Sequence, residues 1–297
     1  MNGPLHEWLA RKRPLLLDGA LGTELESRGV ESGLPLWSAN ALTENPGELL
    51  RLHREYCAAG ADLLTADTFR TTGRTFRRAA LTDRSAELTA LAVALAREAS
   101  GSSGNSRPLV CGSIGPLEDC YRPDLVPSDN ELHAEHAEHA SRLAAAGVDI
   151  LMLETFGTVR ESAIALEESL LTGLETTVSF LCRSDGRLYG GESLDDAVAA
   201  ILPLGPAAIL INCLPPAAAE PILTRLRALT SLPLGAYANV GRAGEESTGK
   251  LVRAVDAETY ARFALRWAEL GASIIGGCCG TNPADIRLIN EKLRYAA

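Results

Sequence analysis

Short apolar segments and longer amphipathic segments alternate along the whole chain. The short segments are continuous runs of Leu, Ile, Val and Ala, which are typical of parallel strands covered by helices on both faces. The longer segments repeat their apolar residues at helical spacing. The alternation predicts eight strands, which span Leu15–Gly19, Asp62–Asp67, Leu109–Ser113, Asp149–Glu154, Thr177–Cys182, Ala207–Cys213, Leu232–Ala238 and Ser273–Cys278.

A helix is expected after each strand. Gly60, Gly147 and Gly271 stand just before predicted strands, where glycine commonly ends a helix. Eight strand–helix units predict an α/β protein, a single (β/α)8 TIM barrel domain over residues 1–297. An open doubly wound sheet is the alternative, but no Gly-x-Gly-x-x-Gly turn follows the first strand. The predicted helices span Pro46–Ala59, Thr72–Ser100, Asn130–Ala146, Val159–Leu171, Leu194–Leu202, Ala217–Leu229, Asp256–Leu270 and Pro283–Tyr295.

Composition narrows the class of protein and the compartment. The net charge of −10 argues against a nucleic-acid partner. The uncharged stretch from Ala197 to Ala219 contains several prolines, so we expect no membrane span there. No apolar leader is visible in Met1 to Pro14, which favours the cytoplasm. In that reducing compartment the seven cysteines are expected to be free thiols or metal ligands rather than disulfides.

Three cysteines lie where predicted strands end. Cys213 closes the sixth strand, and Cys278 and Cys279 follow the eighth within a Gly-Gly-Cys-Cys-Gly segment. The active site of such a barrel lies at the carboxyl ends of its strands, and strands six and eight are next-but-one neighbours. Three converging thiolates would bind Zn²⁺ and leave one position open, as in a catalytic site. The alternative is that these are ordinary buried cysteines of the core.

Two carboxylates are expected at the same end of the barrel. Asp18 and Glu154 each close an apolar run, and a buried carboxylate there needs a cation or hydrogen bonds. They would serve either as a clamp for a substrate ammonium group or as structural groups held by backbone amides or an arginine. In the first case the substrate is an amino acid, whose carboxylate could bind backbone N–H groups from Gly19 to Thr23.

Aromatic and histidine side chains add two weaker expectations. Trp37, in the loop after the first strand, is either a hydrophobic anchor or an aromatic face for a cationic methyl donor. His133, His136 and His139 recur every three residues between glutamates on a predicted helix. This spacing drifts around the helix, so it indicates a solvated face rather than a metal site.

These motifs together resemble the homocysteine S-methyltransferase family of zinc barrels. The resemblance covers nearly the whole chain, from the Asp-Gly-Ala-Leu-Gly-Thr segment at 18–23 to the Gly-Gly-Cys-Cys-Gly-Thr segment at 276–281, and includes Gly-Ser-Ile-Gly-Pro at 112–116. It implies that the three cysteines are the zinc ligands and that Asp18 and Glu154 hold the amino group of homocysteine. It also places Ser113 and Asn239 at the substrate site, with Asn239 close to the zinc.

The methyl donor is less well defined by the resemblance. The segment Leu-Trp-Ser-Ala at 36–39 is similar to the branch that uses S-methylmethionine or S-adenosylmethionine, while the branch that uses folate and cobalamin needs further large modules. Ala238, Asp67 and the stretch 117–121 depart from the family pattern on the expected donor side. The predicted reaction is zinc-dependent methyl transfer from a sulfonium to homocysteine, giving methionine. The alternatives are a betaine donor, another thiol or selenol acceptor, and a catalytically silent zinc-binding barrel.

Overall fold

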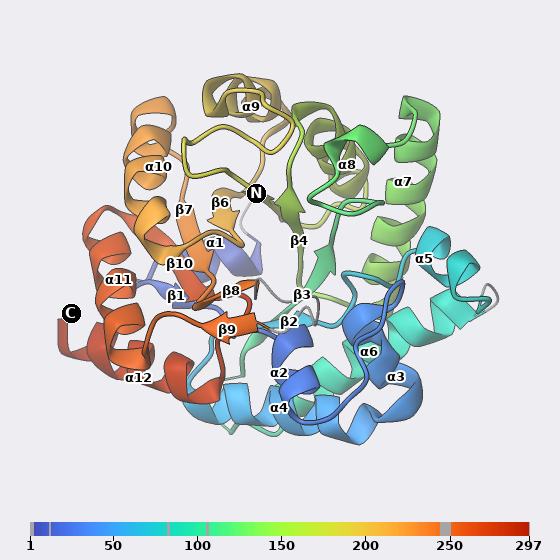
Figure 1. Cartoon of the computed structure of the whole chain (residues 1–297), viewed down its shortest axis with the longest axis horizontal. Helices are drawn as coiled ribbons and strands as arrows, with labels where there is room; N and C mark the ends of the chain where they lie inside the picture. Colours follow the sequence, from blue (N-terminus) through green and yellow to red (C-terminus); the bar gives the residue numbers. More distant parts are fainter. Residues whose placement is uncertain (1–2, 12, 82–83, 105–106, 244–250, 297) are drawn as a thin grey trace.

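Eight parallel strands form the centre of the molecule, and helices surround them (Figure 1). The computed structural model describes residues 3–11, 13–81, 84–104, 107–243 and 251–296. The strand order is β1-β10-β7-β6-β5-β4-β3-β2. A parallel bridge between Leu17 and Leu63 joins the two ends of this order, so that the sheet closes into the predicted barrel.

All eight predicted strands are present, with somewhat different bounds. An antiparallel hairpin that the sequence did not predict follows β7; its strands are β8 (Gly241–Ala243) and β9 (Leu251–Arg253). The barrel strands are β1 (Leu15–Leu16), β2 (Leu63–Ala66), β3 (Leu109–Ile114), β4 (Ile150–Phe156), β5 (Thr176–Phe180), β6 (Ala208–Asn212), β7 (Leu234–Ala238) and β10 (Ala272–Gly277).

The helices confirm the predicted pattern with one exception. The single helix predicted over Thr72–Ser100 is wrong: α5 (Gly73–Arg78) and α6 (Ser85–Gly101) are separate, and Ala80 between them has a left-handed backbone with φ of 56°. Residues 82 and 83 of that prediction lie outside the described residues. The other α-helices are α1 (Pro4–Leu9), α2 (Gly22–Ser27), α3 (Ala41–Glu44), α4 (Pro46–Ala59), α7 (Asp129–Ala146), α8 (Val159–Leu170), α9 (Leu194–Ile201), α10 (Pro216–Leu229), α11 (Ala257–Glu269) and α12 (Pro283–Ala296).

Glycines end three of these helices as expected. Gly60 after α4, Gly147 after α7 and Gly271 after α11 have φ values of 96°, 85° and 88°. Only glycine adopts this conformation without strain, which explains the glycine at these three junctions. Short 3₁₀ helices connect other elements at Trp37–Asn40, Pro123–Leu125 and Leu202–Leu204.

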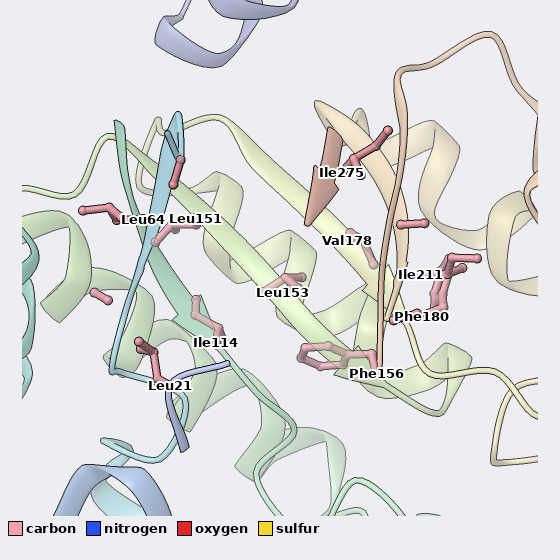
Figure 2. Packing of buried hydrophobic residues seen from close by; sticks show 14 of the residues in the cluster. Leu21, Leu64, Ile114, Leu151, Leu153, Phe156, Val178, Phe180, Ile211 and Ile275 are labelled. Atoms are coloured by element: carbon pink, nitrogen blue, oxygen red, sulfur yellow. The ribbon is translucent and has the colours of Figure 1, made fainter. Parts of the chain in front are cut away.

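The core has two layers because alternate strand residues point to opposite faces. The inner layer fills the barrel, and Leu5 and Trp8 of α1 pack into it. The outer layer lies between the strands and the helices (Figure 2), and includes Leu64, Leu151, Val178, Ile211 and Ile275. No helix within the described residues is long and apolar enough to cross a membrane. With the barrel interior packed, the space for a ligand lies at the end of the strands.

Candidate metal and substrate site

A cavity of about 690 Å³ lies at the carboxyl ends of the barrel strands. Nine of the ten residues that the sequence singled out border it, from the first strand to the last; they are Asp18, Gly19, Thr23, Trp37, Ser113, Glu154, Cys213, Cys278 and Cys279. The tenth, Asn239, lies one layer behind, where its Oδ1 accepts a 3.0 Å hydrogen bond from the Cys279 N–H. The structure therefore brings the predicted set to one place.

The three cysteines form a compact cluster of thiols. Their sulfurs lie within 4.8 Å of one another, and the Sγ atoms of Cys213 and Cys278 are 2.8 Å apart. Four ligands at about 2.3 Å from a tetrahedral zinc ion are separated by roughly 3.8 Å, which falls between these two distances. The cluster can hold a metal of this kind with small movements of the side chains, and three protein ligands leave the fourth position open to the cavity.

An unusual backbone at the end of β6 turns the first of these thiols into the cavity. Cys213 has a φ of 55° and its neighbour Thr155, at the end of β4, has a φ of 67°. Asn212 holds the two together, because its Oδ1 accepts a hydrogen bond from the Thr155 N–H and its Nδ2 donates one to Thr155 Oγ1. Left-handed non-glycine residues are strained and cluster at functional sites.

Glycine permits the close packing beside the other two thiols. A Cβ atom added to Gly277 would lie 2.3 Å from the Thr281 Oγ1, and one added to Gly276 would lie 2.5 Å from the Cβ of Leu17. The Thr281 hydroxyl donates to the Cys278 carbonyl, which fixes the turn that carries both cysteines. Side chains at positions 276 and 277 would push Cys278 and Cys279 away from Cys213.

Mutual hydrogen bonds push the pKa values of the three thiols apart, lowering that of Cys279 and raising that of Cys213. Hydrogen bonds from the Cys213 and Cys278 thiols hold the pKa of Cys279 well below its usual range. The hydrogen bonds that Cys213 makes with these two neighbours, together with burial, raise the pKa of Cys213. One thiolate is thus stabilised by two thiols, and a bound cation would replace the two shared protons.

Asp18 and Glu154 lie in the same cavity, with no cationic partner among the described residues. The Thr65 N–H and hydroxyl donate to the two Asp18 oxygens at 2.8 and 2.9 Å, and the Ser113 hydroxyl donates to Glu154. Neither carboxylate forms a salt bridge with an arginine or lysine whose side chain the structure describes. Burial raises the pKa of Asp18 well above its usual range and that of Glu154 to about 7. Two desolvated carboxylates create a strong site for a cation.

The segment between Gly19 and Thr23 is partly committed to internal contacts. The Ala20 N–H donates to Thr281 Oγ1 at 3.1 Å, and Thr23 Oγ1 accepts from the Gly280 N–H at 2.9 Å. These two hydrogen bonds join the first and last strand ends of the barrel. Binding of a substrate carboxylate by the remaining amides of this segment stays a prediction.

Trp37 lies against the wall of the cavity. Its ring packs edge to face on Phe69 with centroids 6.2 Å apart, and its Cζ2 occupies the place of a Cβ on Gly22, only 2.4 Å away. Phe69 in turn lies against Gly115. The two aromatic residues anchor the loop and border the cavity. A role of Trp37 as an aromatic face for a cationic methyl donor stays a prediction.

Comparison with known proteins places this geometry in a family. The family model for homocysteine S-methyltransferase matches residues 15–293. The chain belongs to this family. It is 34% identical to homocysteine S-methyltransferase of Escherichia coli over 98% of this chain and 99% of that protein, and 32% identical to homocysteine S-methyltransferase YbgG of Bacillus subtilis over 93% of each. The predicted resemblance is thereby confirmed.

Solved structures of the family superimpose on the barrel. The metallated form of the homocysteine methyltransferase MmuM from Escherichia coli matches with a TM-score of 0.84 at 33% identity, covering 98% of this chain and all of that one. The oxidized form matches with a TM-score of 0.86. The carboxyl transferase domain of Rhizobium etli pyruvate carboxylase, at 16% identity and a TM-score of 0.56, shares the fold alone.

The expected solvated face of α7 is wrong for two of its histidines. His136 and His139 are buried, and only His133 is partly exposed, beside Glu168. His139 Nε2 lies 3.1 Å from the Thr68 carbonyl, and burial lowers the pKa of His139 to about 4, so the ring is neutral. The glutamates between them suggested a solvated face, but His139 contacts the Thr68 carbonyl just after β2, and His136 lies 3.3 Å from Glu161 of α8.

Sequence reasoning left out several residues that shape the cavity. Thr65 holds Asp18, Asn212 holds Thr155, and Phe69 and Arg70 line the wall. Asp67 was recognised as the last residue of the second predicted strand and as a departure from the family pattern, but it was not assigned to the site. Its place at a strand end, the same signal that selected Asp18, could have identified it.

Proposed function

We propose that this protein transfers a methyl group from a sulfonium donor, S-methylmethionine or S-adenosylmethionine, to the thiol of L-homocysteine. Zn²⁺ held by Cys213, Cys278 and Cys279 completes the site. The observation that carries the proposal is the presence of three thiols and two carboxylates in one cavity, where neither carboxylate has a salt bridge within the described part of the chain. A thiol-binding metal beside an ammonium-binding pair matches an amino acid that carries a thiol.

The acceptor is positioned by groups at the strand ends. When bound, zinc lowers the pKa of a coordinated thiol, so the sulfur of the acceptor is a thiolate at neutral pH. Asp18 and Glu154 bind the ammonium group of homocysteine, and Thr65 and Ser113 fix the orientation of these two carboxylates. The protein thereby fixes both ends of the acceptor and reduces the entropy that the reaction must lose.

The donor faces the acceptor sulfur from the aromatic wall. Trp37 and Phe69 offer ring faces and edges that favour a poorly hydrated cation such as a sulfonium. The acceptor sulfur forms a bond to the methyl carbon as the bond from that carbon to the sulfonium sulfur breaks. The products are methionine and a neutral thioether, and the thiol proton leaves to solvent when the acceptor binds. No general base is needed.

A second acceptor chemistry is supported by one relative. Selenocysteine Se-methyltransferase of Brassica oleracea is 28% identical over 94% of this chain. A selenol suits the same thiophilic site, so selenohomocysteine and selenocysteine belong in any test of this protein. Substrates and donors are small molecules, and the free thiols of the site require a reducing compartment such as the cytoplasm.

A donor panel tests the proposal. The zinc-loaded protein is incubated with homocysteine and, in turn, S-methylmethionine, S-adenosylmethionine and betaine, and methionine is followed by mass spectrometry. We expect turnover with a sulfonium donor and loss of both zinc and turnover in Cys278→Ala. Cys182→Ala, a buried cysteine far from the cluster in sequence, is the matched control. Turnover with betaine alone, or undiminished turnover in zinc-free Cys278→Ala, would contradict the proposal.

A further inference from the structure

Asp67 is a buried carboxylate that the reaction described above does not use. It follows β2, lines the cavity and has only 3% of its surface exposed. Its Oδ1 accepts a 2.6 Å hydrogen bond from the Ser38 hydroxyl, whereas its Oδ2 is buried and has no partner among the described residues. An unsatisfied buried carboxylate oxygen is costly, so a ligand that supplies a hydrogen bond would be strongly favoured.

The Asp67 Oδ2 atom lacks a hydrogen-bond donor within the described part of the chain, and this indicates the kind of ligand that would bind there. A carboxylate accepts hydrogen bonds, and a sulfonium has no N–H or O–H group to donate. A primary ammonium carries a positive charge and three donors, and such charge-assisted hydrogen bonds are the strong ones. Burial raises the pKa of Asp67 to about 6, which leaves the group largely ionised above neutral pH. Asp67 therefore matches an ammonium, while the neighbouring Trp37 and Phe69 match the sulfonium.

We propose that Asp67 binds the α-ammonium group of the methyl donor. This inference rests on the proposed function and assigns a residue to the amino group that S-methylmethionine and S-adenosylmethionine share. The two amino-acid substrates are then recognised by separate carboxylates. Homocysteine uses Asp18 and Glu154, and the donor uses Asp67, which stands two residues beyond the threonine that holds Asp18.

Arg70 supplies the complementary charge for the carboxylate of such a donor. It lines the same cavity, its guanidinium carbon lies 5.3 Å from the Phe69 ring centroid, and its buried Nε has no partner in the described part of the chain. Its Nη1 donates a 3.3 Å hydrogen bond to the Glu118 carbonyl. Arg78, which also lines the cavity, is instead paired with the Glu118 carboxylate. Asp67 and Arg70 thus stand on either side of Phe69 in one short segment, as expected of a site for a zwitterion.

The test compares two donors that differ only in the amino group. They are S-methylmethionine and (3-carboxypropyl)dimethylsulfonium, its des-amino analogue, each assayed with saturating homocysteine at pH 8. We expect wild-type kcat/KM to favour S-methylmethionine by about tenfold or more, the worth of one charge-assisted hydrogen bond. In Asp67→Asn this ratio falls close to one, because KM for S-methylmethionine rises and KM for the analogue does not. An unchanged ratio, or an equal loss with both donors, would overturn the inference.

Two further variants separate charge from local structure. Ser38→Ala removes the hydrogen bond to Asp67 but keeps the carboxylate, so the preference for S-methylmethionine is retained. Arg70→Met lowers kcat/KM for S-methylmethionine but not for its carboxamide, in which the negative charge is absent. Loss of preference in Ser38→Ala, or an Arg70→Met effect on both compounds alike, would show a structural role instead.

Direct binding keeps this test independent of turnover. Calorimetric titration of S-methylmethionine into the zinc-loaded protein without homocysteine should show binding to wild type and at least tenfold weaker binding to Asp67→Asn. If wild type binds S-methylmethionine in this way but turns over no donor, the proposed function fails and the Asp67 site stands. If donors are turned over but Asp67→Asn binds S-methylmethionine as wild type does, the Asp67 site alone fails.

Discussion

The acceptor side and the donor side of the cavity differ in how their polar groups are held. On the acceptor side, Asp18 and Glu154 stand at strand ends and receive hydrogen bonds from the neighbouring strands. On the donor side, Asp67 and Arg70 stand on a loop, and each has a buried polar atom without a partner in the described residues. The acceptor side is therefore preorganised by the barrel itself, whereas the donor side is completed by its ligand. Donor choice can change by altering loops without disturbing the metal cluster.

Removal of the metal should abolish methyl transfer but leave donor binding intact. This is the largest expected effect. Stripping the protein with a chelator at pH 8 should reduce methyl transfer to background, because the acceptor sulfur then has no site. Binding of S-methylmethionine, measured by calorimetry, should persist because Asp67 and Arg70 do not touch the cysteines. Restored turnover after zinc is added back is the control, and loss of donor binding in the stripped protein would refute this separation.

The second largest effect is expected when Glu154, one of the two carboxylates of the acceptor side, is replaced. Glu154→Gln should raise KM for homocysteine by about tenfold to a hundredfold, since a hydrogen bond to a charged group contributes about 1.5–3 kcal/mol. Ser113→Ala, which removes only the hydroxyl that orients Glu154, should have a smaller effect in the same direction. Steady-state kinetics with each substrate varied in turn is the measurement. A larger change in the donor KM than in the homocysteine KM would contradict the division between the two sides.

The cost of the unpaired donor-side carboxylate should appear in stability. Asp67 has a folded-state pKa of about 6 against an ordinary value of 3.8. Because the raised pKa belongs to the folded state, the ionised form destabilises the fold; the penalty is absent below about pH 4 and complete above about pH 6. Asp67→Asn should raise the free energy of unfolding by about 3 kcal/mol at pH 8 and by much less at pH 4. Urea denaturation at both values checks this, and equal stabilisation at both would be inconsistent with it.

The smallest effect is expected for His139, which lies behind the cavity and contacts the Thr68 carbonyl. The Thr68 hydroxyl in turn exchanges hydrogen bonds with the backbone of Ser113. His139→Leu should lower the free energy of unfolding by about 1–2 kcal/mol and raise KM for homocysteine modestly. His133→Leu, on the partly exposed part of the same helix, is the matched control and should change neither quantity. Equal effects of the two substitutions would show that the contact with Thr68 is unimportant.

The acceptor side could be predicted from the sequence because its residues follow directly from the fold. Parallel strands end at one edge, so polar residues that close apolar runs, such as Asp18, Glu154 and Cys213, must meet there. On the donor side Asp67 also ends a predicted strand, whereas Arg70 lies in the following loop, where no such rule applies. Asp67 was passed over because one carboxylate on a strand end is informative only when its partners are known. The structure supplies that information through the pairing of Oδ1 and the isolation of Oδ2.

Two further predictions were wrong for local reasons: the single helix over Thr72–Ser100 and the solvated face with His136 and His139. The amphipathic pattern from Thr72 to Ser100 continues through the break near Ala80, because both α5 and α6 bury one face and the pattern does not record a change of direction. His136 and His139 were taken as solvated because glutamates lie between them. In the structure His136 lies against Glu161 of α8. Its polar neighbour is therefore a buried residue of the next helix, which the pattern along α7 alone does not reveal.

The left-handed backbone at Trp37, Thr155 and Cys213 has a consequence for anyone who would build this site anew. Of the four non-glycine residues with positive φ in the described chain, these three border the cavity. Copying the three cysteines onto another barrel would reproduce the ligands but not the turn that aims Cys213 inward. A designer must transplant the peptide conformation of the β4 and β6 ends, together with the asparagine that bridges them, before the thiols can share one ion.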